Sequence, residues 1–336
     1  MFNSKIIGLG HFVPENIVTN DDLSQLMDTN DQWIQERTGI KQRRWAVKGD
    51  GNTTFTMGLK AANNAITNSG INKQDIDFII FATLSPDYYF PGPGVQIQEA
   101  LGIKTVGALD VRNQCSGFIY GLSVADQFIK TGMYKNILVI GSELQSLALD
   151  VSTRGRNLSV LFGDGAGAAI LSQESDNKKG ILSSHLHSEG EHALELAAEA
   201  PGMGKRWVTD IISDNNPNDM SYRPYMNGKF VFKNAVKRFS EVIFQGLKAN
   251  DLSVSDIDML IPHQANLRIA QFIQKKFELS NNQVFNNIQY YGNTTAASIP
   301  IAMSEAYEQG KIKSNDIVVL AAFGSGFTWG SVIIKW

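Results

Sequence analysis

The sequence has a single cysteine, Cys115, among 336 residues, so no disulfide can form within the chain. This usage fits a reducing compartment. No apolar run approaches the roughly 18 residues that a transmembrane helix needs. The first ten residues carry no apolar segment followed by a cleavage site, so no secretory signal is expected. These absences predict a cytoplasmic protein without a membrane span.

The chain also lacks an excess of charge of one sign. Its 30 lysines and arginines face 33 aspartates and glutamates, which leaves a net charge of −3. This balance indicates neither nucleic acid nor an anionic membrane as a partner. Three histidines, His185, His187 and His192, lie close together in the sequence but have no clear ligand partners, so no metal site is predicted. A phosphate loop and a full dinucleotide fingerprint are missing as well.

Short apolar, β-branched runs alternate with helical stretches along the chain. The runs that predict strands are 76–83, 106–111, 137–140, 166–171, 259–261 and 317–322. Continuously apolar strands between helices imply sheets that are buried on both faces. The pattern and the length predict an α/β protein with two domains or one large unit.

Two of these strand units resemble each other. DIDFII (75–80) recurs as DIDMLI (256–261), an offset of 181, and NILVI (136–140) has a counterpart in DIVVL (316–320), an offset of 180. We interpret the chain as two related α/β halves, 1–172 and 173–336. Between residues 187 and 226 the pattern gives way to Gly-, Pro- and Asn-rich turn chemistry, which predicts a loop excursion of the second half.

The repeat also predicts where a site would form. The same offset carries Cys115 to about Ala296, three residues after Asn293. Both positions lie between strand units and open a helical pattern. A pseudo-twofold axis would bring the two helix starts together near the middle of the molecule.

Cys115 is the first candidate catalytic residue. It follows a predicted strand and precedes a helical pattern that ends near Thr131-Gly132. A helix N-terminus lowers a thiol pKa and favours the nucleophilic thiolate. The alternative is a lone buried cysteine that acts as a small hydrophobic residue.

His263 follows the end of a predicted buried strand, where catalytic groups of α/β sheets gather. A structural histidine that caps the next helix is the alternative. Asn293 stands in GNTT before a helical pattern, which is also ordinary turn and N-cap chemistry, but the repeat places it opposite Cys115. The glycine-rich segment 323–330 exposes backbone N–H groups that suit an oxyanion hole, or forms a tight turn without a ligand.

Together these segments resemble the β-ketoacyl-acyl-carrier-protein synthase III family of thiolase-fold condensing enzymes. The resemblance runs almost end to end. It rests on DQWIQERTGI (31–40), CSGF (115–118), FGDGAGA (162–168), PHQAN (262–266), GNTT (292–295) and FGSGFTWG (323–330), in that order.

The resemblance implies a five-layered αβαβα fold of two βαβαβαββ halves, and a homodimer. It implies that Cys115 takes an acyl group from acyl-coenzyme A. His263 and Asn293 would hold the carbonyl of a malonyl-acyl-carrier-protein thioester while carbon dioxide leaves. The backbone N–H groups of Cys115 and Ser325 would hold the second oxyanion. No cofactor is implied, because coenzyme A enters as a thioester substrate.

Binding residues are implied in the same way. Trp33 and Arg37, with Arg154, would hold the coenzyme A adenine end, and Phe90 would reach the acyl pocket of the partner subunit. Carrier-protein docking would use the basic residues Lys233, Arg268, Lys275 and Lys276, the last three on one helix face. A solvated helix face is the alternative for this basic stripe.

Three departures from the family pattern affect the expected choice of acyl primer more than the expected reaction. Residues 112–114 before the nucleophile are larger than the small residues usual in the family, Ser325 replaces the middle glycine of its turn, and the stretch 187–226 is longer than usual. Primer length and branching therefore stay open.

Other readings of the same residues remain. A non-decarboxylating thiolase-fold acyltransferase would use the same thiol. A papain-like hydrolase also has Cys, His and Asn in this order, but the local signature around its cysteine is missing here. A catalytically silent acyl-binding partner would not need all three residues.

Overall fold

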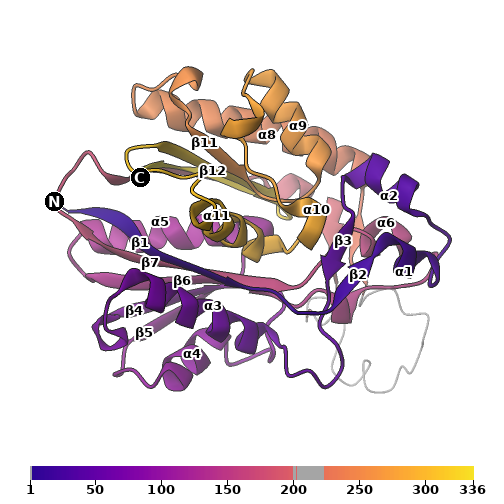
Figure 1. Cartoon of the computed structure of the whole chain (residues 1–336), viewed down its shortest axis with the longest axis horizontal. Helices are drawn as coiled ribbons and strands as arrows, with labels where there is room; N and C mark the ends of the chain where they lie inside the picture. Colours follow the sequence, from indigo (N-terminus) through magenta and orange to yellow (C-terminus); the bar gives the residue numbers. More distant parts are fainter. Residues whose placement is uncertain (1, 200–201, 203–222) are drawn as a thin grey trace.

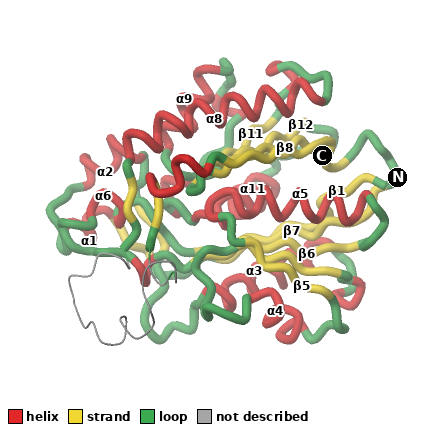
Figure 2. The backbone as a smooth tube through the Cα atoms, turned by 180° about the vertical axis from the view of Figure 1, so that it is seen from behind, coloured by secondary structure: helices red, strands yellow, loops and turns green. Residues whose placement is uncertain are grey.

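The computed structural model describes residues 2–199, 202 and 223–336. Helices and sheets alternate in five layers, αβαβα (Figure 1). Two helices, α5 (Gly117–Lys130) and α11 (Ser298–Glu308), lie between the two large sheets, as Figure 2 also shows from behind. The outer layers are α3 (Thr54–Ser69) with α4 (Pro93–Leu101), and α8 (Gly228–Ala249) with α9 (Leu267–Lys276). The predicted five-layered fold is confirmed.

The first sheet has the strand order β1-β7-β6-β4-β5. Its strands are β1 (Asn3–Phe12), β7 (Gly165–Glu174), β6 (Asn136–Glu143), β4 (Phe78–Ala82) and β5 (Gly107–Val111). β4 is parallel to β5 and β6, whereas β7 is antiparallel to β6 and β1. All the strands predicted in this half are present. β6 and β7 extend three residues beyond the apolar runs, since polar residues continue the ladder there.

The second sheet has the order β11-β12-β13-β8. It comprises β11 (Met259–Pro262), β12 (Ile317–Gly324), β13 (Thr328–Lys335) and β8 (Gly180–Ser188). Strand pairing fixes how the sheets correspond: Phe78 faces Ile137 in the first, and Met259 faces Val318 in the second. Phe78 and Met259 are 181 residues apart, and so are Ile137 and Val318. The offset of 180 read from NILVI and DIVVL was therefore wrong by one residue.

The middle helices are apolar almost all round because sheets cover both sides of them. Phe118, Ile119 and Leu122 of α5 are fully buried, and Ala302 and Met303 of α11 pack in the same core cluster. The helix predicted after Cys115 ends at Lys130, with Thr131 as its C-cap. This layer therefore holds both predicted site segments inside the molecule.

Smaller elements gather at one end of the molecule (Figure 1). They are β2 (Ile17–Thr19), β3 (Gln42–Arg44), α1 (Asn20–Ser24), α2 (Asp31–Thr38), α6 (Arg156–Ser159) and α10 (Ile288–Tyr291). Single 3₁₀ turns include η1 (Lys73–Asp75), η2 (Gln114–Ser116), η3 (Ser146–Ala148), η5 (Val254–Asp256), η6 (Asn281–Gln283) and η7 (Thr295–Ala297). Of these, η2 and η7 contact each other at the centre of the molecule.

Most of the predicted excursion 187–226 lies outside the described residues. Its described flanks form η4 (Gly190–Glu195) and the antiparallel pair β9 (Leu196–Ala197) and β10 (Tyr225–Met226). No helix within the described part of the chain is long and apolar enough to cross a membrane.

Truncation of a side chain in the middle layer should destabilise the protein. Leu122→Ala leaves a cavity between two sheets, and we expect the free energy of unfolding to fall by about 2–5 kcal/mol. Met133→Ala, at a residue that is 62% exposed, should change it by less than about 0.5 kcal/mol. Denaturant unfolding measures both, and equal losses would contradict the buried position of α5.

Candidate active site

Cys115 lies in η2, between the end of β5 and the start of α5, and its side chain is 8% exposed. Gln114 before it has a φ of +45°, in the left-handed region that non-glycine residues rarely adopt. Such strain is characteristic of functional turns. The expected lowering of the thiol pKa is not found: burial, and then the nearby Glu143 carboxylate, raise the pKa of Cys115 to about 12. Desolvation of the thiolate outweighs the helix start.

Asn293 reaches the same place from the second half. Its backbone bridges to Phe162: Asn293 N–H donates to Leu161 O at 2.7 Å, and Gly163 N–H donates to Asn293 O at 3.1 Å. Its side-chain Oδ1 accepts from Thr295 N–H at 2.9 Å. No bond to its Nδ2 is found among the described residues, so the amide is available to donate to a ligand.

Thr295 repeats the geometry of Gln114. It opens η7 with a φ of +46°, and it lies 181 residues after Gln114. Each strained turn leads into a middle helix, α5 after η2 and α11 after η7. The contact between η2 and η7 brings the two helix starts together, as the repeat predicts.

His263 follows β11 and is 3% exposed. Its Nδ1 lies 2.6 Å from Ser298 Oγ, at the first residue of α11. Burial lowers the pKa of His263 to about 3, so the imidazole is neutral at neutral pH. Its Nε2 is buried without a hydrogen-bond partner. When Ser298 donates to Nδ1, the ring proton sits on Nε2, which then becomes a free donor.

The glycine-rich turn joins β12 to β13 next to Cys115. A Cβ on Gly324 would lie 2.7 Å from Cys115 Cβ and 3.2 Å from Sγ, so only glycine leaves room for the thiol. The turn is held by Thr328 Oγ1, which lies 2.7 Å from Ser116 Oγ and donates to Ser325 O at 3.1 Å. The hydroxyl of Ser325 donates to the carbonyl of Leu196 in β9.

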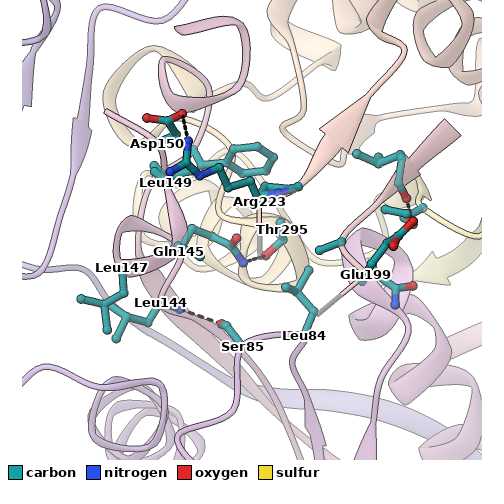
Figure 3. Close-up of a pocket in the computed structure, with 18 of the residues that line it drawn as sticks. Leu84, Ser85, Leu144, Gln145, Leu147, Leu149, Asp150, Glu199, Arg223 and Thr295 are labelled. Atoms are coloured by element: carbon teal, nitrogen blue, oxygen red, sulfur yellow. Dashed lines mark hydrogen bonds and ion pairs between the residues drawn. The ribbon is translucent and has the colours of Figure 1, made fainter. Parts of the chain in front are cut away.

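A cavity of about 1150 Å³ opens beside Cys115. Cys115, Ser325 and Thr295 line it, together with leucines from three segments, as Figure 3 shows for part of the wall. In Figure 3, Gln145 bonds Thr295 inside the cavity, while Asp150 and Arg223 pair at its edge. His263 and Asn293 do not line this cavity. The apolar lining and the thiol suit an acyl chain.

The predicted coenzyme A residues are only partly brought together. The Arg37 guanidinium lies 4.4 Å from the centre of the Trp33 ring. The second arginine over that ring is Arg156, at 5.0 Å. Arg154 instead bonds Asp150 at 2.7 Å. Of the two arginines in Thr-Arg-Gly-Arg, the second therefore lies over Trp33, and the coenzyme A role of Arg154 stays a prediction.

The predicted docking residues lie on an exposed face. Lys233 is on α8, and Arg268, Lys275 and Lys276 are on α9, and all four are exposed. The two helices contact each other, and Arg268 lies 5.6 Å from the ring centre of Phe232. Phe90 is 79% exposed and does not line the cavity of its own chain.

Two buried carboxylates near the site were not identified from the sequence. Asp164 lies in the FGDGAGA segment, and its Oδ1 accepts from the N–H groups of Gln145 and Ser146 and so fixes the cavity wall. Glu143 is fully buried and close enough to affect Cys115. A lone charged residue at the end of an apolar strand is the signal that marks Glu143.

The histidines outside the site have other partners. His185 lies 2.9 Å from Ser183, His187 bonds Gln245, and His192 packs on Phe230. Within the described residues, no group of three or more His, Cys, Asp or Glu is placed to hold a metal ion.

Comparisons with known proteins agree on one family. Models described as 3-oxoacyl-[acyl-carrier-protein] synthase III, and its C-terminal part, match residues 109–190 and 247–336. The chain is 45% identical to the beta-ketoacyl-[acyl-carrier-protein] synthase III of Pasteurella multocida, over 99% of both chains. It is 43% identical to that of Clostridioides difficile, over 98% of both. The crystal structure of the Aquifex aeolicus synthase III superposes with a TM-score of 0.90 at 40% identity, covering 99% of this chain and 100% of that one.

The raised thiol pKa makes alkylation of Cys115 in the resting protein steeply pH-dependent. We expect the iodoacetamide rate to rise roughly tenfold per pH unit between about pH 7 and 10, since only the thiolate reacts. Intact mass reports this directly, because the chain has no other cysteine. A rate that levels off below about pH 8 would contradict the burial of the thiol.

Proposed function

The chain belongs to the 3-oxoacyl-[acyl-carrier-protein] synthase III family, and we propose that it condenses an acyl group with a malonyl thioester, with loss of carbon dioxide. The reaction would start fatty acid synthesis or a related acyl pathway. The observation that carries the proposal is the contact between η2, which contains Cys115, and η7, which follows Asn293, with His263 hydrogen-bonded to Ser298 directly after η7. His263 Nε2 is buried without a partner, and no bond to Asn293 Nδ2 is found among the described residues.

In the first half-reaction, Cys115 Sγ attacks the carbonyl carbon of acyl-coenzyme A. A carbon–sulfur bond forms to Cys115, the bond to coenzyme A breaks, and the thiol proton leaves with coenzyme A. The N–H groups of Cys115 and Ser325 would hold the oxyanion. Capture on sulfur divides one difficult condensation into two easier steps.

In the second half-reaction, the malonyl-carrier-protein thioester loses carbon dioxide. Its thioester oxygen gains negative charge, and His263 Nε2–H and Asn293 Nδ2–H would donate to it. The resulting carbanion attacks the acyl carbonyl. Cys115 leaves as thiolate and takes up one proton, which yields the β-ketoacyl product. Neutral donors are suited to this role, because neither adds negative charge beside an enolate. Each could contribute on the order of 3 kcal/mol.

Partners follow from the exposed surfaces. The face with Lys233, Arg268, Lys275 and Lys276 would dock an acidic carrier protein through charge attraction. A homodimer is supported by β5, an edge strand with Leu109 37% exposed, and by the exposed aromatic residues Tyr88, Tyr89 and Phe90 nearby. A cytoplasmic location, the absence of a resident cofactor and the division into two halves remain parts of this proposal.

The two half-reactions are tested by the intact mass of the protein and by the release of carbon dioxide. Incubation with acyl-coenzyme A thioesters of graded length should add one acyl group to the protein, and Cys115→Ser should abolish it. Malonyl-carrier protein should then release carbon dioxide. His263→Ala and Asn293→Ala should each slow this release about 10²–10³-fold but leave acylation much less affected.

These outcomes separate the alternatives. Acylation without malonyl-dependent carbon dioxide would indicate a non-decarboxylating acyltransferase. Hydrolysis of the acyl-enzyme as the main product would indicate a thioester hydrolase. No adduct with any acyl length would contradict the whole proposal.

The coenzyme A end is tested by the two arginines. We expect Arg156→Ala to raise KM for acyl-coenzyme A about tenfold with little change in kcat, since a stacking and phosphate partner is lost. Arg154→Ala should change KM less, because Arg154 pairs with Asp150 and only Arg156 of the two lies over the Trp33 ring. A larger effect for Arg154→Ala would restore the assignment made from the sequence.

A further inference from the structure

Glu143, the last residue of β6, is a fully buried carboxylate that the reaction above does not use. Its Oε2 accepts from Ser85 Oγ at 2.6 Å and Thr83 Oγ1 at 3.1 Å. The Leu84 N–H donates to Oε2 at 3.2 Å, and the Ala296 N–H of η7 donates to Oε1 at 3.4 Å. One carboxylate thus joins the turn after β4 to the start of the second-half helix α11.

The partners of Glu143 all act as donors. Ser85 Oγ already accepts from Leu144 N–H, and Thr83 Oγ1 accepts from Ser85 N–H. The N–H groups of Leu84, Ala296 and the Gln145 side chain can only donate, and both hydroxyls can donate to the carboxylate as well. Burial raises the pKa of Glu143, but these hydrogen bonds favour the charged form. The site therefore contains a buried carboxyl group that is hydrogen-bonded at both oxygens.

The repeat identifies the position in the second half that corresponds to Glu143. Cys115 and Ala296 are equivalent positions, each following a residue with positive φ and each preceding a middle helix. The position equivalent to Glu143 is Gly324, the last residue of β12. At Cys115 the glycine leaves space for the thiol. At Ala296 the corresponding N–H faces the carboxylate of Glu143.

Glu143 is also coupled to Asn293. Gln145 Nε2 lies 3.3 Å from Glu143 Oε2 and 3.3 Å from Thr295 Oγ1. Thr295 N–H in turn fixes Asn293 Oδ1, which leaves Nδ2 for the substrate. The hydrogen bonds of Glu143 therefore hold the strained turn that orients the carboxamide.

We propose that Glu143 is a positioning residue for decarboxylation: a built-in anion that fills the pseudo-symmetric counterpart of the oxyanion site and locks the Thr295 turn against Cys115. This inference rests on the proposed function. It assigns two effects to one carboxylate, namely the orientation of Asn293 and a negative charge beside the thiol.

The charge of Glu143 predicts a change in the pH profile of Cys115 alkylation that a merely structural role would not produce. Glu143 contributes to the raised thiol pKa, after burial. His263 is neutral, and the other ionisable groups that line the cavity are Tyr89, Arg112, Asp150, Glu199 and Arg223. Removal of the carboxylate should lower the thiol pKa, so alkylation of Cys115 should begin at lower pH.

Two variants separate charge from shape. Glu143→Gln keeps the length but loses the charge and turns an amide donor toward Ser85, Thr83 or Ala296. We expect carbon dioxide release from malonyl-carrier protein to fall at least about tenfold, with acylation by acyl-coenzyme A retained within about threefold. The alkylation profile should shift by about one pH unit to lower pH. Glu143→Asp keeps the charge and should restore carbon dioxide release to within about threefold of the wild type.

A matched control is Asp126→Asn. Asp126 is another fully buried carboxylate, bonded to Ser4 and Lys130 at the far end of α5. It should lower stability without moving the alkylation profile. If Glu143→Gln does not fold, Ser85→Ala is the substitute variant, since it removes the shortest hydrogen bond to the carboxylate. It should slow carbon dioxide release about threefold or more.

The outcomes are distinct. A wild-type protein that releases no carbon dioxide would contradict the proposed function itself. An active wild type, with Glu143→Gln unchanged in both carbon dioxide release and alkylation profile, would overturn only the role of Glu143. The same would follow if Asp126→Asn shifted the profile as far as Glu143→Gln.

Discussion

α5 and α11 are enclosed between two sheets, and their first turns contact each other through η2 and η7. The site depends on this contact. A helix buried on all sides cannot shift without disturbing both sheets, so each start is fixed to the packing of the core. Gln114 and Thr295 hold strained backbone there, which persists only where the surroundings impose it. Cys115 and Asn293 are thereby presented from rigid elements rather than from free loops.

Burial sets the chemistry of the site as much as geometry does. It keeps Cys115 as a thiol and His263 as a neutral ring, so the resting site has little nucleophilic or basic character. The Glu143 carboxylate also lies at this centre, and hydrogen-bond donors surround it. Negative charge that develops on a substrate would therefore meet neutral donors in a dry environment, where hydrogen bonds are strong.

Much of this arrangement could be predicted from the sequence. The apolar runs located six of the nine strands in the two large sheets, but not β1, β8 or β13. The repeat indicated that Cys115 and Ala296 occupy matching helix starts. The motifs identified the family. The offset between NILVI and DIVVL was one residue wrong, because short apolar matches do not fix register, whereas strand pairing does.

Other features could not be predicted because they depend on contacts between distant segments. The pKa of Cys115 is raised, since tertiary burial outweighs the local effect of a helix start. Arg156 lies over Trp33, whereas Arg154 pairs with Asp150. Glu143 gave only a weak signal, as its partners come from three segments.

The central claim is that one thioester meets His263 and Asn293 beside an acylated Cys115. The most direct measurement is a crystal structure of the protein acylated on Cys115 and bound to a non-decarboxylating malonyl thioester analogue. The account predicts the analogue's thioester oxygen about 3 Å from both His263 Nε2 and Asn293 Nδ2. An analogue bound with that oxygen out of reach of both nitrogens would contradict it.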